Sequence, residues 1–292
     1  MAEFCSECGA ALTGSRRFCP ECGFATGSAP TATVSPAQVV PPPAEAEVTT
    51  DPNAEVWRRA TSASQMERVA LAGDRSTPAD VLRKLADDPD DFVRRSSAGN
   101  PSLPIDVLPQ LAADPADFVR VSVAGNPSTP PDVLRGLAAD HYTGVRESVA
   151  YHGSTPADLL RKLAADPLSD VRVSVARNQS TPPDVLRGLA ADHYTRVRES
   201  VAGNGSTPAD LHRKLAADPV SDVRVSVAVN LSTPPDVLRR LATDDNWLVR
   251  AFVARNESTP ADLLPQLAAD PDEDVQLAAR VAMDPELEDS QD

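Results

Sequence analysis

The chain has 292 residues and a mass of 30.9 kDa, which is long enough for about two domains. It carries 43 acidic and 28 basic residues, and the resulting formal net charge of −15 argues against a surface built mainly to bind nucleic-acid phosphates. No run reaches the roughly 18 apolar residues of a transmembrane helix, and the N-terminus lacks the apolar stretch of a secretory signal. We therefore expect a soluble, cytoplasmic protein that does not contact a membrane.

The N-terminal segment contains all four cysteines of the chain, in the strings CSECG and CPECG. Two CxxC pairs can each form a tight turn that points two thiolates at one ion, and they suit a tetrahedral Zn²⁺ site without an open position for chemistry. We predict a zinc ribbon over residues 1–26, which has too little core to fold without its metal. An iron–sulfur cluster also takes four cysteines and is the alternative cofactor, whereas two disulfides do not suit a reducing cytoplasm. The predicted ligands are Cys5, Cys8, Cys19 and Cys22.

Residues 27–50 are rich in Ala, Thr, Val and Pro, with three consecutive prolines from Pro41 to Pro43. The segment has few charges and no apolar periodicity, and its prolines disfavour a helix. We interpret it as a disordered, extended linker that buries nothing.

The remainder of the chain is built from a repeat of 26 residues, most units of which begin with Ser-Thr-Pro. Eight units cover residues 76–283; in the second, Ser102-Leu103-Pro104 takes the place of Ser-Thr-Pro. A capping half-repeat at 51–75 precedes them, and an acidic tail at 284–292 follows. Residues 128–150 and 180–202 differ only at Gly144 and Arg196, which indicates that a block of 52 residues was duplicated.

Each unit contains one helical pattern near its start, for example in the unit that begins at Ser154. We predict that Thr155 is the N-cap, that Pro156 occupies the first helical position and that Asp158 lies at N3. Apolar residues then recur at helical spacing through Leu159, Leu160, Leu163 and Ala164.

A second helical pattern follows in the same unit, with Asp166 as the predicted N-cap and Asn178 as a left-handed terminating residue. The string Val171-Arg172-Val173 also alternates like a β-strand. The position of Val173, however, holds Arg or Glu in other units, whereas Val171 and Val175 occupy positions that stay mostly apolar. A spacing of four residues favours a helix over a strand.

Helices this short are marginal alone, so their stability must come from stacking on neighbouring units. We predict an all-α, right-handed solenoid with two short helices per repeat. The recurring string LxxLAxD…VRxxVAxNxSTPxxLL resembles the leucine-rich repeat variant family, and the spacing from Asp166 to Arg172 is also similar to HEAT repeats. The resemblance implies alternating α- and 3-10 helices, but both segments carry α-type caps, so either can be α or 3-10. The cysteine segment is similar to short bacterial zinc ribbons; a cysteine cluster before such repeats is known in the family, and this keeps the iron–sulfur alternative open.

Polar residues recur at fixed positions in the units. One row of aspartates begins at Asp80, a second at Asp88, a row of arginines at Arg94 and a row of asparagines at Asn100. The arginines could form an anion-binding stripe, but we favour aspartates that cap helices and arginines that pair with them within or between units. We expect the asparagines, with His152 in the same position, to bond backbone groups in the turns.

The turn between the two helices varies most between units and contains aromatic residues. An exposed aromatic side chain suits a binding hot spot for a protein partner; equally, the rings can simply pack over the neighbouring unit. The candidates are Phe92, Phe118, Tyr142, Tyr194 and Trp247.

The sequence shows no nucleophile–base pair, phosphate-binding loop or open metal site. We therefore predict a non-enzymatic protein-interaction scaffold without a small-molecule substrate, in which the zinc ribbon is a second contact. A nucleic-acid-binding protein and an iron–sulfur redox or regulatory protein are the alternatives.

Overall fold

The computed structural model describes residues 3–4, 11–12, 54–62 and 64–284, and the chain divides into two units, Met1–Thr50 and Asp51–Asp292. In the first unit, strand β1 (Glu3–Phe4) pairs antiparallel with β2 (Ala11–Leu12). This pairing brings the chain before Cys5 beside the chain after Cys8. The four cysteines, the predicted linker at 27–50 and residues 285–292 lie outside the described residues.

The second unit consists of helices that follow the repeat. It begins with α1 (Ala54–Ala60) and α2 (Gln65–Gly73). The first helices of the eight repeats are α3 (Ala79–Ala86), η1 (Ile105–Val107) with α5 (Leu108–Leu111), α7 (Pro131–Leu137), α9 (Ala157–Leu163), α11 (Pro183–Leu189), α13 (Ala209–Leu215), α15 (Pro235–Leu241), and η2 (Ala261–Leu263) with α17 (Leu264–Leu267). The second helices are α4 (Asp91–Gly99), α6 (Asp117–Gly125), α8 (Thr143–Tyr151), α10 (Ser169–Arg177), α12 (Thr195–Gly203), α14 (Ser221–Val229), α16 (Trp247–Arg255) and α18 (Glu273–Met283).

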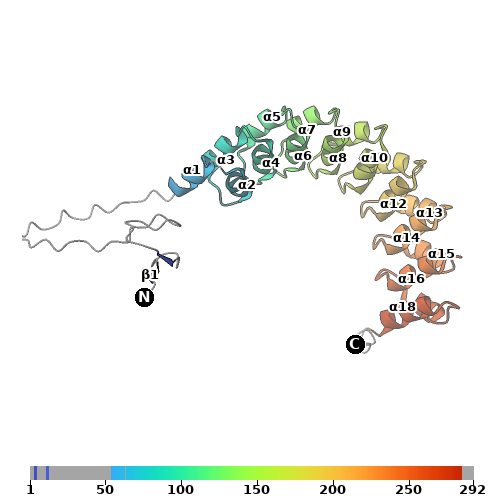
Figure 1. The fold of residues 1–292 in the computed structure, drawn as a ribbon. Coiled ribbons are helices and arrows are strands. Elements are labelled where there is room, and N and C mark those ends of the chain that lie inside the picture. Colours follow the sequence, from blue (N-terminus) through green and yellow to red (C-terminus); the bar gives the residue numbers. More distant parts are fainter. Residues whose placement is uncertain (1–2, 5–10, 13–53, 63, 285–292) are drawn as a thin grey trace, which may run out of the picture. The chain divides into compact units, whose positions relative to one another are not determined.

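The repeats stack as a solenoid, as predicted. Each second helix packs on the second helix of the next repeat, and these helices form the inner side of the curved stack (Figure 1). The first helices lie on its outer side (Figure 1). Between the two rows runs a continuous core of leucines from the first helices and valines and alanines from the second helices. The strand alternative is wrong for the string at 171–175, because it lies within α10.

The 3-10 turns have a local cause that the sequence analysis did not use. In two repeats the first helix begins as a 3-10 turn, and in both a proline follows the turn, at Pro109 and Pro265. Proline has no backbone N–H to donate to the carbonyl four residues earlier, so the α-helical ladder cannot run through that position. The other six repeats have arginine there and form an unbroken α-helix.

Three predicted caps are wrong in detail. Helix α9 begins after Pro156, and the buried Thr155 donates its hydroxyl to the Val149 carbonyl of the preceding repeat at 2.5 Å instead of capping its own helix. Likewise α10 begins after Leu168, two residues beyond Asp166. Asn178 has φ −69° and ψ 121°, which is extended rather than left-handed. Each of these side chains bonds to the neighbouring repeat, and that tertiary contact replaces the expected local one.

The asparagines bond backbone groups, as predicted, and these bonds also join successive repeats. Asn178 donates its amide to the carbonyls of Ala150 and His152, at 2.8 and 2.9 Å. Its side-chain oxygen accepts from the Ser180 N–H at 2.8 Å. His152 replaces asparagine in one repeat and bonds in the same way, because its Nε2 lies 3.0 Å from the Asn126 carbonyl oxygen.

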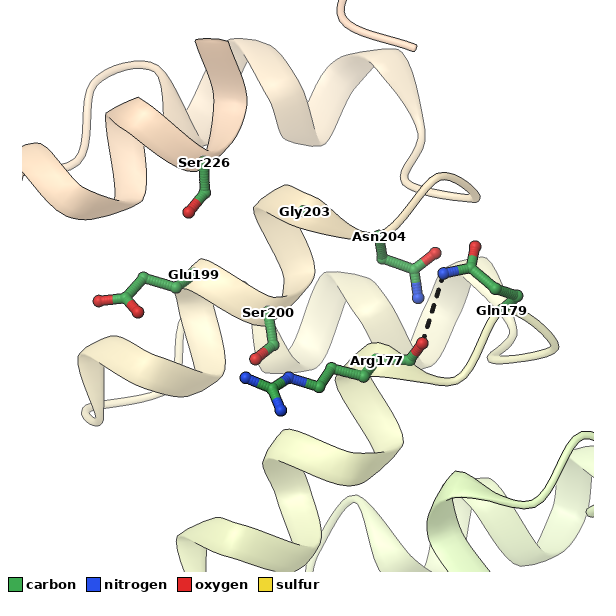
Figure 2. Close-up of a pocket in the computed structure, with 7 residues that line it drawn as sticks. All are labelled: Arg177, Gln179, Glu199, Ser200, Gly203, Asn204 and Ser226. Carbon is green, nitrogen blue, oxygen red and sulfur yellow. Dashed lines mark hydrogen bonds between the residues drawn. The ribbon is translucent and has the colours of Figure 1, made fainter. Parts of the chain in front are cut away.

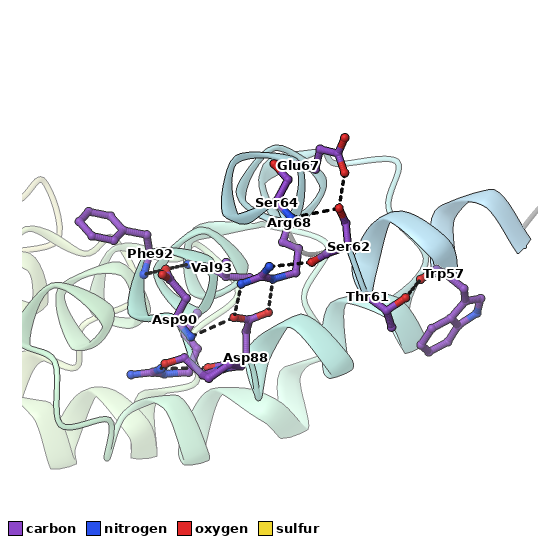
Figure 3. Close-up of polar contacts among 12 residues, drawn as sticks. Trp57, Thr61, Ser62, Ser64, Glu67, Arg68, Asp88, Asp90, Phe92 and Val93 are labelled. Carbon is purple, nitrogen blue, oxygen red and sulfur yellow. Dashed lines mark hydrogen bonds and ion pairs between the residues drawn. The ribbon is translucent and has the colours of Figure 1, made fainter. Parts of the chain in front are cut away.

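The arginine row also connects adjacent repeats. Arg172 donates from Nε and Nη2 to the carboxylate of Asp192 in the next repeat, at 2.7 and 3.1 Å, and from Nη1 to the Asp166 carbonyl of its own repeat at 2.9 Å. Eight such pairs, which we call the inner ladder, run from Arg68–Asp88 to Arg250–Asp270. Figure 3 shows the first pair, where Arg68 also donates to the Ser62 carbonyl at 2.7 Å. The structural interpretation of this row is therefore confirmed.

A second set of pairs lies on the outer side. Arg161 donates to Asp184 of the next repeat at 2.9 Å, and both side chains are about half exposed. Six such pairs form an outer ladder, which is interrupted where proline replaces the arginine: Arg83–Asp106, Arg135–Asp158, Arg161–Asp184, Arg187–Asp210, Arg213–Asp236 and Arg239–Asp262.

The inner ladder predicts a loss of stability in acid. Burial alone would raise the pKa of Asp192, but hydrogen bonds from Arg172 and from the Tyr194 N–H outweigh it and lower this pKa below its usual value. The same balance lowers the pKa values of five further aspartates of the inner ladder: Asp114, Asp140, Asp166, Asp218 and Asp244. The pKa of Asp270 is lowered chiefly by its hydrogen bond from Arg250. A carboxylate with a lower pKa in the folded state contributes its full stability above about pH 4 and loses it as the pH falls further. We expect the thermal midpoint to drop steeply below about pH 4.

Calorimetry between about pH 6 and pH 2.5 would measure this dependence. Asp192→Asn should lower the midpoint at neutral pH and flatten its fall in acid, whereas Asp184→Asn in the exposed outer ladder should change it little. A midpoint that stays constant down to about pH 3 would contradict the role of the inner ladder.

A buried histidine gives a second prediction. His212 is fully buried in α13 at the position that Leu160 occupies in α9. Its Nδ1 lies 3.1 Å from the Thr233 hydroxyl, but its Nε2 has no hydrogen-bond partner, and burial lowers its pKa. We expect His212→Leu to raise the free energy of unfolding by about 1–3 kcal/mol. The reciprocal change Leu160→His should lower it by at least about 2 kcal/mol, and urea denaturation of both variants would measure the difference. A destabilised His212→Leu protein would show that the imidazole contributes a bond that outweighs its burial.

Candidate functional site

The N-termini of the second helices form one candidate surface. In α4, α16 and α18 the N-cap is Asp90, Asn246 or Asp272, whose side chain accepts a hydrogen bond from the first turn. In the five repeats between α4 and α16, the N-cap is apolar and makes no side-chain bond. We call these five residues the rim row: Ala116, Tyr142, Leu168, Tyr194 and Val220.

The inner ladder allows these helices to begin without a capping side chain. Asp140 accepts from the N–H of Tyr142 at 2.8 Å, and Asp192 accepts from the N–H of Tyr194 at 2.9 Å. The aspartate two residues before the N-cap thus holds the turn that leads into the helix. The N–H groups of the first helical turn, however, lack the side-chain acceptor that Asp90 provides in α4. An apolar N-cap costs about 0.5–2 kcal/mol relative to Asp or Asn.

The rim row exposes large apolar groups. Tyr142, Leu168 and Tyr194 are 45%, 45% and 49% exposed, and they belong to three successive repeats. Leu168, Ala116 and Val220 were missed in the sequence analysis, which looked for aromatic residues only. Alignment of the eight repeats would have found them, because this position changes from polar at both ends of the array to apolar in the middle.

The five predicted aromatic residues do not form one row. Tyr142 and Tyr194 are N-caps, Trp247 is the first residue of α16, and Phe92 and Phe118 are the second residues of α4 and α6. Each is therefore at a helix start but in one of three different positions of the repeat.

These rings also contact neighbouring repeats. Phe92 stacks on the partly buried Phe118 with centroids 5.6 Å apart, and the guanidinium of Arg172 lies 5.4 Å from the ring centroid of Tyr194. Such contacts orient the rings while Phe92, Tyr142, Tyr194 and Trp247 remain largely exposed. Packing and exposure thus occur together, and a role in partner binding stays a prediction.

The inner face is a second candidate surface. The inward-facing residues of each second helix have i, i+3, i+4 and i+7 spacing. In α12 they are Arg196, Glu199, the buried Ser200 and Gly203. Figure 2 shows the side chains of Arg177, Glu199 and Ser200 around a shallow cavity of about 280 Å³, whose lining also includes Gly203 and Ser226.

A second cavity adjoins the first and is more apolar. Its volume is about 450 Å³, and Val225, Val229 and Leu231 contribute its aliphatic side chains. Gly203 and Ser226 line both cavities, so the two form one groove across α10, α12 and α14. We call it the inner groove.

The described residues do not bring metal ligands together. Within residues 54–62 and 64–284 no three His, Cys, Asp or Glu side chains form a potential metal site. In the same part of the chain, none of the helices combines the length and apolar character needed to cross a bilayer. The predicted zinc ligands Cys5, Cys8, Cys19 and Cys22 remain outside the described residues.

The fold can now be compared with known proteins. The family model described as leucine rich repeat variant matches residues 117–141 and 247–272. A solved structure described as a leucine-rich repeat variant with a novel repetitive structural motif is 26% identical, and the match covers 76% of this chain and 88% of that one with a TM-score of 0.55. The chain therefore shares the helical-repeat fold of leucine-rich repeat variant proteins.

Two engineered proteins are more distant. One is described only as an engineered protein, and the other as computationally designed armadillo repeat proteins for modular peptide recognition. Each is 16% identical over 78% of this chain and 97% of its own, with TM-scores of 0.28 and 0.22, too low to say more about this chain. No curated protein matches the chain in sequence.

Proposed function

We propose that the protein is a non-enzymatic scaffold that binds another protein through the rim row. The observation that carries this proposal is the exchange of a stabilising N-cap for an apolar side chain in five consecutive repeats. Three of these side chains, Tyr142, Leu168 and Tyr194, are exposed. An apolar N-cap lowers stability, and an exposed tyrosine ring or leucine side chain buries little apolar surface in return. A partner that covers the row would recover the cost, because buried aromatic side chains dominate protein–protein binding energy.

The distribution of cations disfavours the nucleic-acid alternative. The arginines of both ladders are engaged with aspartates of adjacent repeats, so their charge is compensated within the array. Nucleic-acid affinity depends largely on cations that can neutralise phosphates. A chain of net charge −15 whose recurring arginines are paired does not offer such a surface.

The rim row yields a test that separates binding from folding. We expect a triple variant with Tyr142→Asp, Leu168→Asp and Tyr194→Asp to bind the protein partner at least about tenfold more weakly. The same variant should have a higher thermal midpoint of unfolding. Each aspartate removes an apolar contact but restores an N-cap worth about 1 kcal/mol. Affinity capture with the full chain identifies the partner, and titration of the purified partner by calorimetry measures the change.

Ile105→Asp is the matched control. Ile105 is also exposed, but it lies at the start of a first helix and not in the rim row, so replacing its apolar side chain with aspartate should leave binding intact. Unchanged partner affinity in the triple variant, or equal loss in the control, would exclude the rim row as the binding surface.

We further propose that Cys5, Cys8, Cys19 and Cys22 hold one structural Zn²⁺ in a ribbon that provides a second contact. The proposal rests on the two CxxC pairs and is supported by the β1–β2 pairing on either side of the first pair. We expect metal analysis of the purified full chain to give about one zinc per molecule, and Cys8→Ser to lose it. Iron with visible absorbance would instead assign an iron–sulfur cluster.

A further inference from the structure

The two copies of the duplicated block differ in a pattern that coincides with the inner groove. Residues 128–179 and 180–231 differ at seven positions, and four of these place unburied residues on the inner face or in the turns that follow its helices. The four pairs are Gly144 and Arg196, Tyr151 and Gly203, Arg177 and Val229, and Gln179 and Leu231.

One of these exchanges opens the groove. Tyr151 ends α8 with 64% of its surface exposed, whereas Gly203 ends α12 and lines both cavities. A Cβ added to Gly203 would meet nothing within 4 Å, so the absence of a side chain here is not required by packing. The glycine instead leaves space between Arg177 on one side and Val229 on the other.

One position on the inner face alternates between a carboxylate and an aliphatic side chain from repeat to repeat. Glu147, Val173, Glu199 and Val225 occupy the same position in α8, α10, α12 and α14. In the part of the chain that the structure describes, Glu147 and Glu199 have no ion-pair partner, in contrast to the aspartates of both ladders. Burial and the charge of Asp170 raise the pKa of Glu147, and together they outweigh the opposing charge of Arg146.

The spacing of these positions fits an extended chain. Adjacent packed helices lie about 8–10 Å apart, and a peptide in the extended polyproline II conformation advances about 3.1 Å per residue with three residues per turn, so that every third side chain points the same way. One repeat of the inner face therefore corresponds to about three residues of a bound segment. A segment that follows the row would meet the carboxylates of Glu147 and Glu199, and between and after them the almost fully buried Val173 and the partly buried Val225.

We propose that the inner face binds an extended segment of a partner protein that carries basic and aliphatic side chains alternately at three-residue spacing. Its basic side chains pair with Glu147 and Glu199, and an aliphatic side chain enters the cavity formed by Val225, Val229 and Leu231. Arg177 is the cation of the groove and donates to main-chain carbonyls of the segment. This surface is separate from the rim row and extends the scaffold function to a second contact.

Two synthetic peptides of twelve residues test the proposal with the full chain. The matched peptide has Lys at positions 1 and 7 and Leu at 4 and 10 in a Gly/Ser background; the control peptide has Lys at 1 and 4 and Leu at 7 and 10. We expect the matched peptide to bind at least about tenfold tighter by fluorescence anisotropy, and its binding to weaken as salt is raised. No saturable binding up to about 1 mM, or equal binding of both peptides, would overturn the proposal.

Variants assign the binding to the groove. The double variant Glu147→Gln, Glu199→Gln should bind the matched peptide about tenfold more weakly. The double variant Asp158→Asn, Asp184→Asn removes the same charge from the outer ladder and should bind the peptide as the unchanged protein does. Gly203→Tyr reproduces the end of α8, so it should fold normally and still block the aliphatic side chain. The rim-row triple variant should bind the peptide normally, so failure here leaves the rim-row proposal intact. Equal effects of the inner and outer charge variants would contradict the assignment.

Discussion

The buried ion pair between an arginine of one repeat and an aspartate of the next is the interaction on which the array depends. Arg172 and Asp192 are each only 8% exposed, and the guanidinium also holds the turn of its own repeat through the Asp166 carbonyl. A helix of nine residues has too few internal bonds to be stable alone. Because each repeat supplies one partner of the pair to each neighbour, no repeat completes its polar contacts without the next.

This constraint divides the surface into fixed and variable parts. The ladders and the asparagine row determine the same positions in most repeats, so few side chains are left to differ. Most differences in the duplicated block occur at helix starts and on the inner face, where no bond between repeats depends on the side chain; the exchange of Asn204 for His152 keeps the bond to the preceding repeat. The duplicated block shows the result directly, because its two copies keep the ladder residues and differ at Tyr151 and Gly203.

The two proposed surfaces lie at positions where the chain departs from the repeated pattern of caps and ion pairs. The rim row has apolar residues at the N-cap position in the middle of the array. Asp90 and Asp272 show that a capping aspartate is compatible with the same position of the repeat. The inner face leaves Glu147 and Glu199 unpaired among the described residues of a chain that otherwise pairs its recurring charges. Both features cost stability in the isolated protein, and both become favourable when a partner covers them.

The sequence by itself determined the repeat, its two helices, the apolar stripes and the polar rows, because each is a matter of periodicity along one chain. It did not determine which partner each polar residue takes: Thr155, Asp158 and Asp166 have plausible local roles but bond to neighbouring repeats. The aromatic residues likewise seemed equivalent until the helix starts were placed, and Leu168 became part of a surface only then. Only the tertiary structure decided these points, because stacking joins residues of different repeats that lie six to twenty-three positions apart, and no local pattern records which of two possible bonds that stacking favours.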